Sequence, residues 1–315
     1  MVARGEVFRA LAAVAVVALV MVVRSLAGTD AVLFPEVGAL AVGLLLVDKN
    51  VWRVSKAGAM VVMSLAATVG VAISILVGDL GVVVSVPCAF LLTGLLLSFF
   101  NVPMYPALAA ALMPQLFGQA SWCYVGVVVA TVGLVLLVQL LLERVGARRV
   151  VLPGVHQPWA DCGAPVRRVV LLTLCAMPLV VAAWLSDWIF MAAPPLLVTL
   201  VEFAQGGSGF RKRPWQVLFM LFFGAMMGSA AVVICSSLGL GHVVAGTGIM
   251  AVMVMLFSIF RKSYAPAATV ALLAMLVEGD AIWAYSVQIA IGGAYAIVVS
   301  SLPYLIFPRG AKQKE

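Results

Sequence analysis

Long apolar stretches separated by short polar connections follow one another along the chain. Twelve such segments lie near residues 7–27, 31–47, 57–78, 80–99, 102–117, 121–142, 168–186, 189–204, 215–237, 240–260, 264–277 and 281–306. A helix needs about 20 apolar residues to cross the hydrocarbon core of a bilayer, and most of the segments approach that length. The pattern predicts an all-α polytopic membrane protein with about twelve transmembrane segments.

The second and fifth segments of each half are shorter than a full crossing requires. Each of these four segments carries a proline, at Pro35, Pro106, Pro195 and Pro266. Proline removes a backbone donor and clashes with the preceding turn. We therefore expect proline-broken helices, which in lipid must pack against neighbours or line a cavity that satisfies the freed carbonyls. A simple kinked helix is the alternative, and the pattern leaves open whether these segments cross fully or re-enter.

The second half of the chain repeats the first. When the halves are aligned so that Pro195 falls on Pro35, further landmarks coincide, the last two pairs after one inserted residue. The matched pairs are Arg53 and Arg213, Thr68 and Gly228, Pro106 and Pro266, Ala107 and Ala267, Trp122 and Trp283, and Tyr124 and Tyr285. A duplicated apolar unit with prolines in matching short segments is the plan of many secondary transporters. The sequence predicts two six-segment repeats.

The distribution of charge predicts the orientation in the membrane. If the N-terminus lies in the cytoplasm and the segments alternate, all of the 19 Lys and Arg residues except Arg24 fall on the cytoplasmic side. Basic residues favour that side, so the pattern supports twelve crossings with both termini in the cytoplasm. Each half then has an even number of crossings, which predicts parallel repeats related by an axis along the membrane normal. The same bias accounts for the net charge of +7 without nucleic acid as a partner.

Composition agrees with a location in the lipid bilayer. The 315 residues are 65% hydrophobic and 10% charged, against about 25% charged residues in soluble domains. We expect a first membrane repeat at 1–145, a cytoplasmic linker at 146–166 and a second membrane repeat at 167–315.

Arg4 and Arg9 precede the apolar run of the first segment, 7–27, which could therefore be a signal peptide. Its counterpart at 168–186 cannot be one, so we interpret the first segment as a retained helix.

Two carboxylates lie within the apolar segments. Glu36 follows Pro35 in the second segment, and Glu202 lies near the inner end of the eighth. A charged side chain at the bilayer centre costs about 2.5–3.5 kcal/mol, so such a group is usually functional or paired. We expect Glu36 to couple transport to protons, unless it lies at the outer interface with Arg24 as its partner. Glu202 is expected at the inner interface near the basic run 211–213.

The fifth segment of each half joins a tyrosine, a proline and a run of small residues. Tyr105 precedes Pro106 directly, and Tyr264 lies two residues before Pro266. The tyrosines are either interfacial anchors or groups that offer a hydroxyl and an aromatic face to a ligand. We expect a substrate path between the repeats. Its candidate residues are Glu36, Pro35, Tyr105, Pro106, Pro195, Thr199, Tyr264, Pro266 and Thr269.

No pattern indicates an enzyme, a cofactor or a metal site. The sequence contains no nucleophile elbow, no His-Glu zinc motif and no dinucleotide fingerprint. Its two histidines, His156 and His242, lie far apart, and its five cysteines form no C-x-x-C pair. The glycines near 206–209 lack the Lys-Ser/Thr pair of a P-loop.

One stretch of the second half resembles a known family. Between Pro195 and Gly228 it carries Thr199, a Gly-Ser-Gly turn, the basic run 211–213, Gly224 and Gly228. This order resembles the membrane domain of the fusaric acid resistance and aromatic acid exporter (FUSC-like) superfamily, where a short apolar segment precedes a basic turn and a helix with spaced glycines. The first half matches with Ser64 and Thr68 in place of the glycines. The resemblance implies six-segment units and export of organic acids, with an adaptor protein or a homo-oligomer in place of the large soluble domain that most members add.

A second resemblance comes from Ser263-Tyr264-Ala265-Pro266-Ala267, which is similar to the signature of the HPP family. Tyr264 and Ala265 replace the His and the first Pro of that signature, and Met104 and Tyr105 replace them in the first half. Members of the family are linked to nitrite transport, so this resemblance implies a transporter of small anions.

We expect a transporter of the cytoplasmic (inner) membrane. Its substrate is a small organic or aromatic acid or a similar amphipathic compound, and the direction we expect is export. Proton coupling through Glu36 is a hypothesis. One alternative is an HPP-like nitrite transporter. The other is a non-transporting membrane scaffold or subunit that docks a partner through its basic inner face. A wet cavity between the repeats favours a transporter, whereas a dry, close-packed interface favours the scaffold.

Overall fold

The structure is a computed structural model that describes residues 2–29, 33–49, 51–118, 121–150, 163–205 and 209–302. All regular structure within these residues is helical, and eight of their helices are long and apolar enough to cross a membrane. These are α1 (Val2–Ala27), α3 (Lys56–Val77), α4 (Val82–Phe99), α6 (Trp122–Arg144), α7 (Gly163–Leu185), α9 (Pro214–Ser237), α10 (His242–Phe260) and α12 (Ala281–Val299). The helices are those of an all-α membrane protein, as predicted. Residues 151–162, most of the expected linker at 146–166, lie outside the described residues.

Four shorter apolar helices coincide with the segments that were expected to be short. They are α2 (Val37–Leu40) with the π-helical turn Ala41–Leu46 that continues it, α5 (Pro106–Phe117), α8 (Pro194–Phe203) with the 3-10 turn Ile189–Ala192 before it, and α11 (Ala265–Leu273) with the 3-10 turn Ala274–Leu276 after it. A further 3-10 turn, Gly78–Leu80, connects α3 to α4.

Pro35, Pro106, Pro195 and Pro266 lie at or just before the start of their helices. Pro106 is the first residue of α5, Pro194 and Pro195 open α8, and Pro266 is the second residue of α11. Pro35 lies just ahead of α2. A proline in the first turn removes no helical hydrogen bond, because the N–H groups there have no partner within the helix. These prolines mark where regular helix starts. In the eighth segment the break is real, because Pro194 separates the 3-10 turn Ile189–Ala192 from α8, whereas among the described residues no helical turn directly precedes Pro106 or Pro266.

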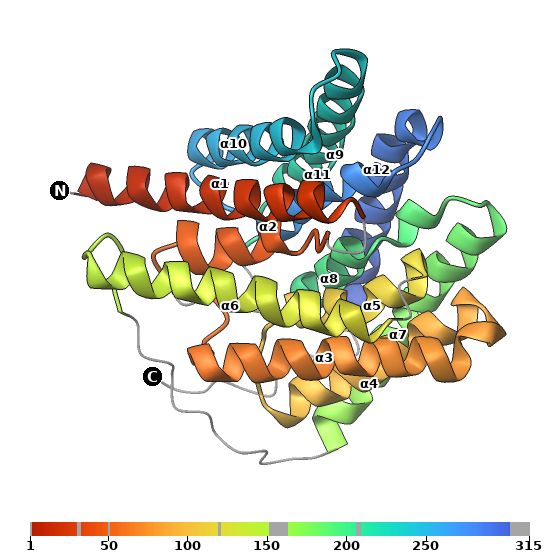
Figure 1. Cartoon of the computed structure of the whole chain (residues 1–315). Coiled ribbons are helices and arrows are strands. Elements are labelled where there is room, and N and C mark those ends of the chain that lie inside the picture. The colour runs from red at the N-terminus through yellow and green to blue at the C-terminus, as the bar shows by residue number, and fades with distance from the viewer. Residues whose placement is uncertain are drawn as a thin grey trace.

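The two halves of the chain pack together through matching pairs of helices. α1 lies along α10, and α4 lies along α7 (Figure 1). Between these outer pairs, α2 packs against α11 and α5 packs against α8. Within the halves, α3 contacts α4, α5 and α6, and α9 contacts α10, α11 and α12. The short helices therefore lie at the junction of the two halves, surrounded by long ones.

Glycines allow the closest of these helix contacts. A Cβ at Gly228 in α9 would overlap the Ala271 carbonyl of α11, and a Cβ at Gly70 in α3 would lie 2.5 Å from the Ala111 carbonyl of α5. Small residues let helix backbones approach this closely. Gly70 in the first half and Gly228 in the second thus make similar contacts, although the sequence alignment pairs Gly228 with Thr68.

Tyrosines at matching positions fasten the sixth helix of each half to the fifth. The Tyr124 hydroxyl donates to the Ala110 carbonyl at 2.8 Å, and the Tyr285 hydroxyl donates to the Val270 carbonyl at 2.6 Å. The Ala110 carbonyl needs this donor because Pro114, four residues later in α5, has no N–H. Within the hydrocarbon core no water is present to donate to this carbonyl in place of the missing backbone N–H.

Ion pairs join the helix ends of the first half on the side that the charge pattern assigns to the cytoplasm. Arg9 in α1 pairs with Asp48 at 3.3 Å, and Glu143 in α6 pairs with Lys56 at 2.5 Å and with Arg148 at 3.2 Å. Glu143 and Arg148 are largely buried, which makes this pair less open to screening by salt than a surface pair.

Candidate functional site

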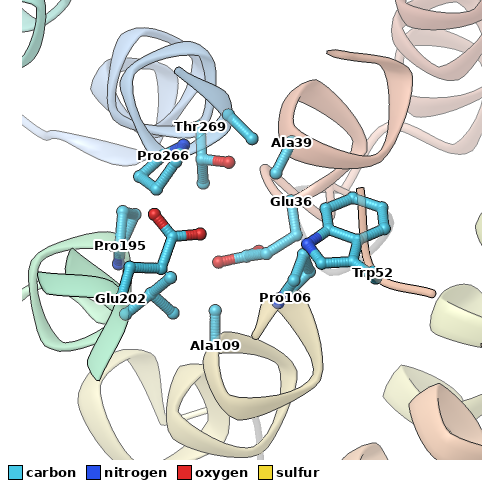
Figure 2. A pocket seen from close by; sticks show the side chains of 11 residues that line it. Glu36, Ala39, Trp52, Pro106, Ala109, Pro195, Glu202, Pro266 and Thr269 are labelled. Atoms are coloured by element: carbon cyan, nitrogen blue, oxygen red, sulfur yellow. The ribbon is translucent and has the colours of Figure 1, made fainter. Parts of the chain in front are cut away.

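The four short helices meet around one small pocket at the junction of the two halves. Figure 2 shows the residues of these helices converging on it from four sides. The wall consists of Glu36, Ala39, Trp52, Pro106, Ala109, Pro195, Val198, Glu202, Ala265, Pro266 and Thr269. The prolines at the starts of α5, α8 and α11 all belong to it, so the first turns of three helices meet at this place.

Glu36 precedes α2 directly, and its carboxyl group points into the pocket (Figure 2). The residue is 1% exposed, and neither Oε1 nor Oε2 has a hydrogen-bond partner among the described residues. Arg24, the partner that the sequence left open, donates from Nη2 to the Met275 carbonyl at 3.3 Å. Glu36 is therefore an interior carboxyl group whose oxygens face the pocket.

A second carboxyl group faces Glu36 across the pocket. Glu202 lies in the last turn of α8 and points toward Glu36 from the opposite side (Figure 2). Its Oε2 is buried and has no hydrogen-bond partner among the described residues. Glu202 was expected at the inner interface near the basic run 211–213, and Arg211 does lie close by, donating from Nη1 to the carbonyl of the next residue, Phe203, at 3.2 Å. The Glu202 side chain itself points into the pocket (Figure 2).

Tyr264 and Thr199 support Glu202 from behind the pocket wall. The Tyr264 hydroxyl donates to Thr199 Oγ1 at 2.9 Å, and Thr199 Oγ1 donates to the Pro195 carbonyl at 2.8 Å. The Tyr264 hydroxyl is also within hydrogen-bond reach of the Glu202 carboxylate. Both Tyr264 and Thr199 are fully buried. This chain of contacts ties α11 to α8 and orients Glu202.

Thr269 and Trp52 complete the wall. Thr269 is 1% exposed, and its Oγ1 has no hydrogen-bond partner among the described residues. Trp52 is buried and packs where Gly43 leaves room, because a Cβ at Gly43 would overlap the indole ring. Gly43 belongs to the π-helical turn after α2, and such turns are frequent at functional sites.

The structure brings most of the predicted site residues to this place. Those in the wall are Glu36, Pro106, Pro195, Pro266 and Thr269. Thr199 and Tyr264 lie behind it, and Pro35 is buried beside Glu36 without reaching the wall. Tyr105, next to Pro106, is 8% exposed, and its hydroxyl has no hydrogen-bond partner among the described residues.

Sequence reasoning missed several members of the wall. They are Glu202, Trp52, Ala39, Ala109, Val198 and Ala265. One signal could have found Glu202, since Pro195, Val198 and Glu202 follow at steps of three and four residues and so share one helix face. Trp52 carries no such signal, because it lies in the connection between two segments.

The pocket is small, and its charge is set by carboxyl groups. The centre of a water molecule can occupy about 10 Å³ of it, which is room for about one water. No Lys, Arg or His stands in the wall that the described residues form. A site with two ionisable carboxyl groups and no basic partner attracts protons and cations and repels free anions. A larger ligand fits only if the short helices move apart.

No group of three or more His, Cys, Asp or Glu residues in the described part of the chain is arranged to hold a metal ion. Comparisons of the chain with protein families, with curated proteins and with solved structures found no match. The functional argument therefore rests on the pocket and on the residues that form it.

Proposed function

We propose that this protein is a secondary transporter of the cytoplasmic membrane whose substrate path runs through the pocket between the four short helices. The observation that carries the proposal is the pair Glu36 and Glu202, which face each other across a pocket whose wall is otherwise largely apolar. Burying a carboxylate without partners is expensive, and side chains of this kind inside membrane segments usually mark ion or substrate paths.

The architecture we propose is two parallel six-segment repeats, with twelve segments and both termini in the cytoplasm. The matched helix pairs support it, since α1 with α10 corresponds to α7 with α4, and α2 with α11 corresponds to α8 with α5. In many transporters the substrate site lies where two repeats meet, formed by short or discontinuous helices. The pocket has this position between the halves.

The chemistry of the wall favours a substrate that is not a free anion. Organic and aromatic acids, which the FUSC-like resemblance implies, would meet two carboxyl groups and no basic side chain among the described wall residues. Such an acid would enter in its neutral form or together with a proton. The same argument applies to nitrite. A small amphipathic compound in neutral or cationic form fits the wall more directly, because Trp52 and the prolines offer apolar surface.

Proton coupling follows from the position of Glu36. Its carboxylate has no hydrogen-bond partner among the described residues, so a bound proton removes an otherwise uncompensated buried charge. When the helices open and water enters, the ionised form is solvated and the proton can leave. In one half of the cycle a proton enters from the outside and is released inside; in the other half substrate occupies the pocket and leaves the cell, so that inward proton flow drives export.

The test is flux in proteoliposomes containing the full chain, with a panel of labelled organic acids and amphipathic amines. Wild-type protein should move at least one compound at a rate that depends on the pH gradient, and Glu36→Gln should abolish that dependence. Glu278→Gln, which changes an exposed carboxylate outside the pocket, is the matched control and should behave as wild type. Unchanged pH dependence in Glu36→Gln would contradict proton coupling at this site.

The scaffold alternative is favoured by one observation, the narrowness of the pocket. A protein that only docks a partner needs no internal space, and this pocket has room for about one water. If no compound of the panel moves and the chain co-purifies with a fixed partner through its basic face, the scaffold becomes the better account.

A further inference from the structure

Buried oxygen atoms that lack hydrogen bonds gather at the pocket. Buried oxygens without a hydrogen-bond partner occur at several places among the described residues, but four of them belong to this one wall: both carboxyl oxygens of Glu36, Oε2 of Glu202 and Oγ1 of Thr269. All three residues belong to the wall, and Figure 2 shows the two carboxyl groups pointing toward each other with Thr269 beside them. Native proteins leave few buried polar atoms unsatisfied, so this gathering calls for a bound species.

The atoms come from three separate helical segments, since Glu36 precedes α2, Glu202 ends α8 and Thr269 lies in α11. Carboxylate and hydroxyl oxygens are the ligands that hard cations prefer. The free space is about that of one water molecule, which is also about the size of an alkali-metal ion without its hydration shell. A divalent ion would need about six or more oxygen ligands, part of them retained waters, and the free space holds no such waters beside the ion.

We propose that Glu36, Glu202 and Thr269 bind one alkali-metal cation, which competes with protons for the same oxygens. Binding of the cation does not depend on whether the protein is a transporter. A role of the cation as the coupling ion, in contrast, rests on the transport function proposed above. The cation neutralises one carboxylate charge, and a proton retained between the two carboxyl groups neutralises the other.

The surroundings of the site contain few other groups that titrate. Tyr264 and Tyr105, which directly precede α11 and α5, lie within electrostatic range of Glu202, and Tyr124 of α6 lies within that range of Glu36. Arg168 in α7 lies near Tyr105 and donates from Nη2 to the Ala204 carbonyl at 3.1 Å. Because the two carboxyl groups are the acids that reach the pocket itself, the competition with protons is assigned to them.

The test uses the purified full chain in lipid nanodiscs and follows the midpoint of thermal unfolding, Tm. Sodium, potassium or lithium chloride is titrated against choline chloride at equal ionic strength, at mildly acidic and mildly alkaline pH. A cation that binds only the folded protein raises Tm in a saturable way. We expect such a rise with at least one alkali cation, larger at alkaline pH, and none with choline.

Variants assign the effect to the pocket. Glu36→Gln and Glu202→Gln should abolish the cation-dependent rise in Tm, and Thr269→Val should weaken the apparent affinity by about tenfold, while Glu278→Gln keeps it. Direct binding of radioactive sodium or rubidium to the nanodiscs repeats the comparison for any variant whose Tm is itself altered. Equal Tm curves in alkali and choline salts for the wild type at both pH values, or an alkali effect that persists in both glutamine variants, would overturn the proposal.

The outcomes separate this site from the transport function. Proton-dependent flux without any alkali effect would refute the cation site and leave the transporter in place. A saturable alkali effect that needs Glu36 and Glu202, with no flux of any compound, would support the cation site and count against transport.

Discussion

Single side chains replace the backbone bonds that the short helices lack. The Tyr124 hydroxyl is the donor to the Ala110 carbonyl, which Pro114 leaves without its helical partner. Gln115 has a different role: its Nε2 donates to the Gly70 carbonyl of α3 at 2.6 Å and so links α5 to that helix. Because the hydrocarbon core contains no water, such side-chain donors are needed to satisfy buried carbonyls around α5.

Replacing Tyr124 by phenylalanine tests this dependence. Tyr124→Phe keeps the ring but leaves the Ala110 carbonyl buried and unpaired, which we expect to destabilise the fold by about 1–3 kcal/mol. Unfolding by denaturant in mixed micelles measures the change. Tyr295→Phe is the control, at a tyrosine that is only half-buried; its hydroxyl donates to the Cys175 carbonyl, and its loss should have a smaller effect. Equal stability of wild type and Tyr124→Phe would show that the carbonyl does not depend on the tyrosine.

The two glutamates show how far a sequence determines a side chain's role. Glu36 could be predicted as an interior group, because it stands within an apolar segment beside a proline. The same reasoning does not place Glu202, because it lies near a segment end and close to the basic run 211–213; only its spacing from Pro195 points to the pocket. Which way an end residue faces depends on the rotation of α8, and that rotation is fixed by packing against α5 and α12.

Among the elements, the short helices owe their lengths to residues that the sequence displays. Prolines lie at the starts of these helices. The sequence predicted that each proline interrupts its segment, but it did not predict that a helix begins there. The π-helical turn Ala41–Leu46 could not be predicted, because it depends on the fit of Trp52 against Gly43, two residues that meet only in the folded chain. Local sequence therefore indicates where these elements begin, and tertiary contacts decide how they end.

The contact between α9 and α11 gives a prediction at this scale. Gly228→Ala places a Cβ against the Ala271 carbonyl, so the two helices must separate or strain. We expect a loss of about 1–3 kcal/mol of stability, the usual range for overpacking. Gly126→Ala in α6 adds the same group where nothing lies within 4 Å, and it should be neutral or slightly stabilising. Thermal unfolding of both variants in nanodiscs compares them, and equal midpoints would contradict the close packing of α9 on α11.

For the whole molecule, the pattern of apolar segments was sufficient to predict a helical membrane protein, since helix is the simplest way to satisfy the backbone in lipid. It also indicated which segments are short. The enclosure of those segments at the junction of the halves depends on contacts between residues far apart in the chain, such as Gly246 with Met21 and Gly94 with Val169. A single sequence does not record such pairs.

The account as a whole proposes that the pocket opens in turn to both sides of the membrane. The most direct test is a single cysteine at Ala109, a small residue of the pocket wall, in a background without the five native cysteines. A water-soluble, membrane-impermeant methanethiosulfonate is added to intact cells and to inside-out vesicles. Ala110→Cys, at a neighbouring buried position outside the wall, is the control. We expect Ala109→Cys to react from both sides and Ala110→Cys from neither, whereas an unreactive Ala109→Cys, or one that reacts from a single side only, would contradict transport through this pocket.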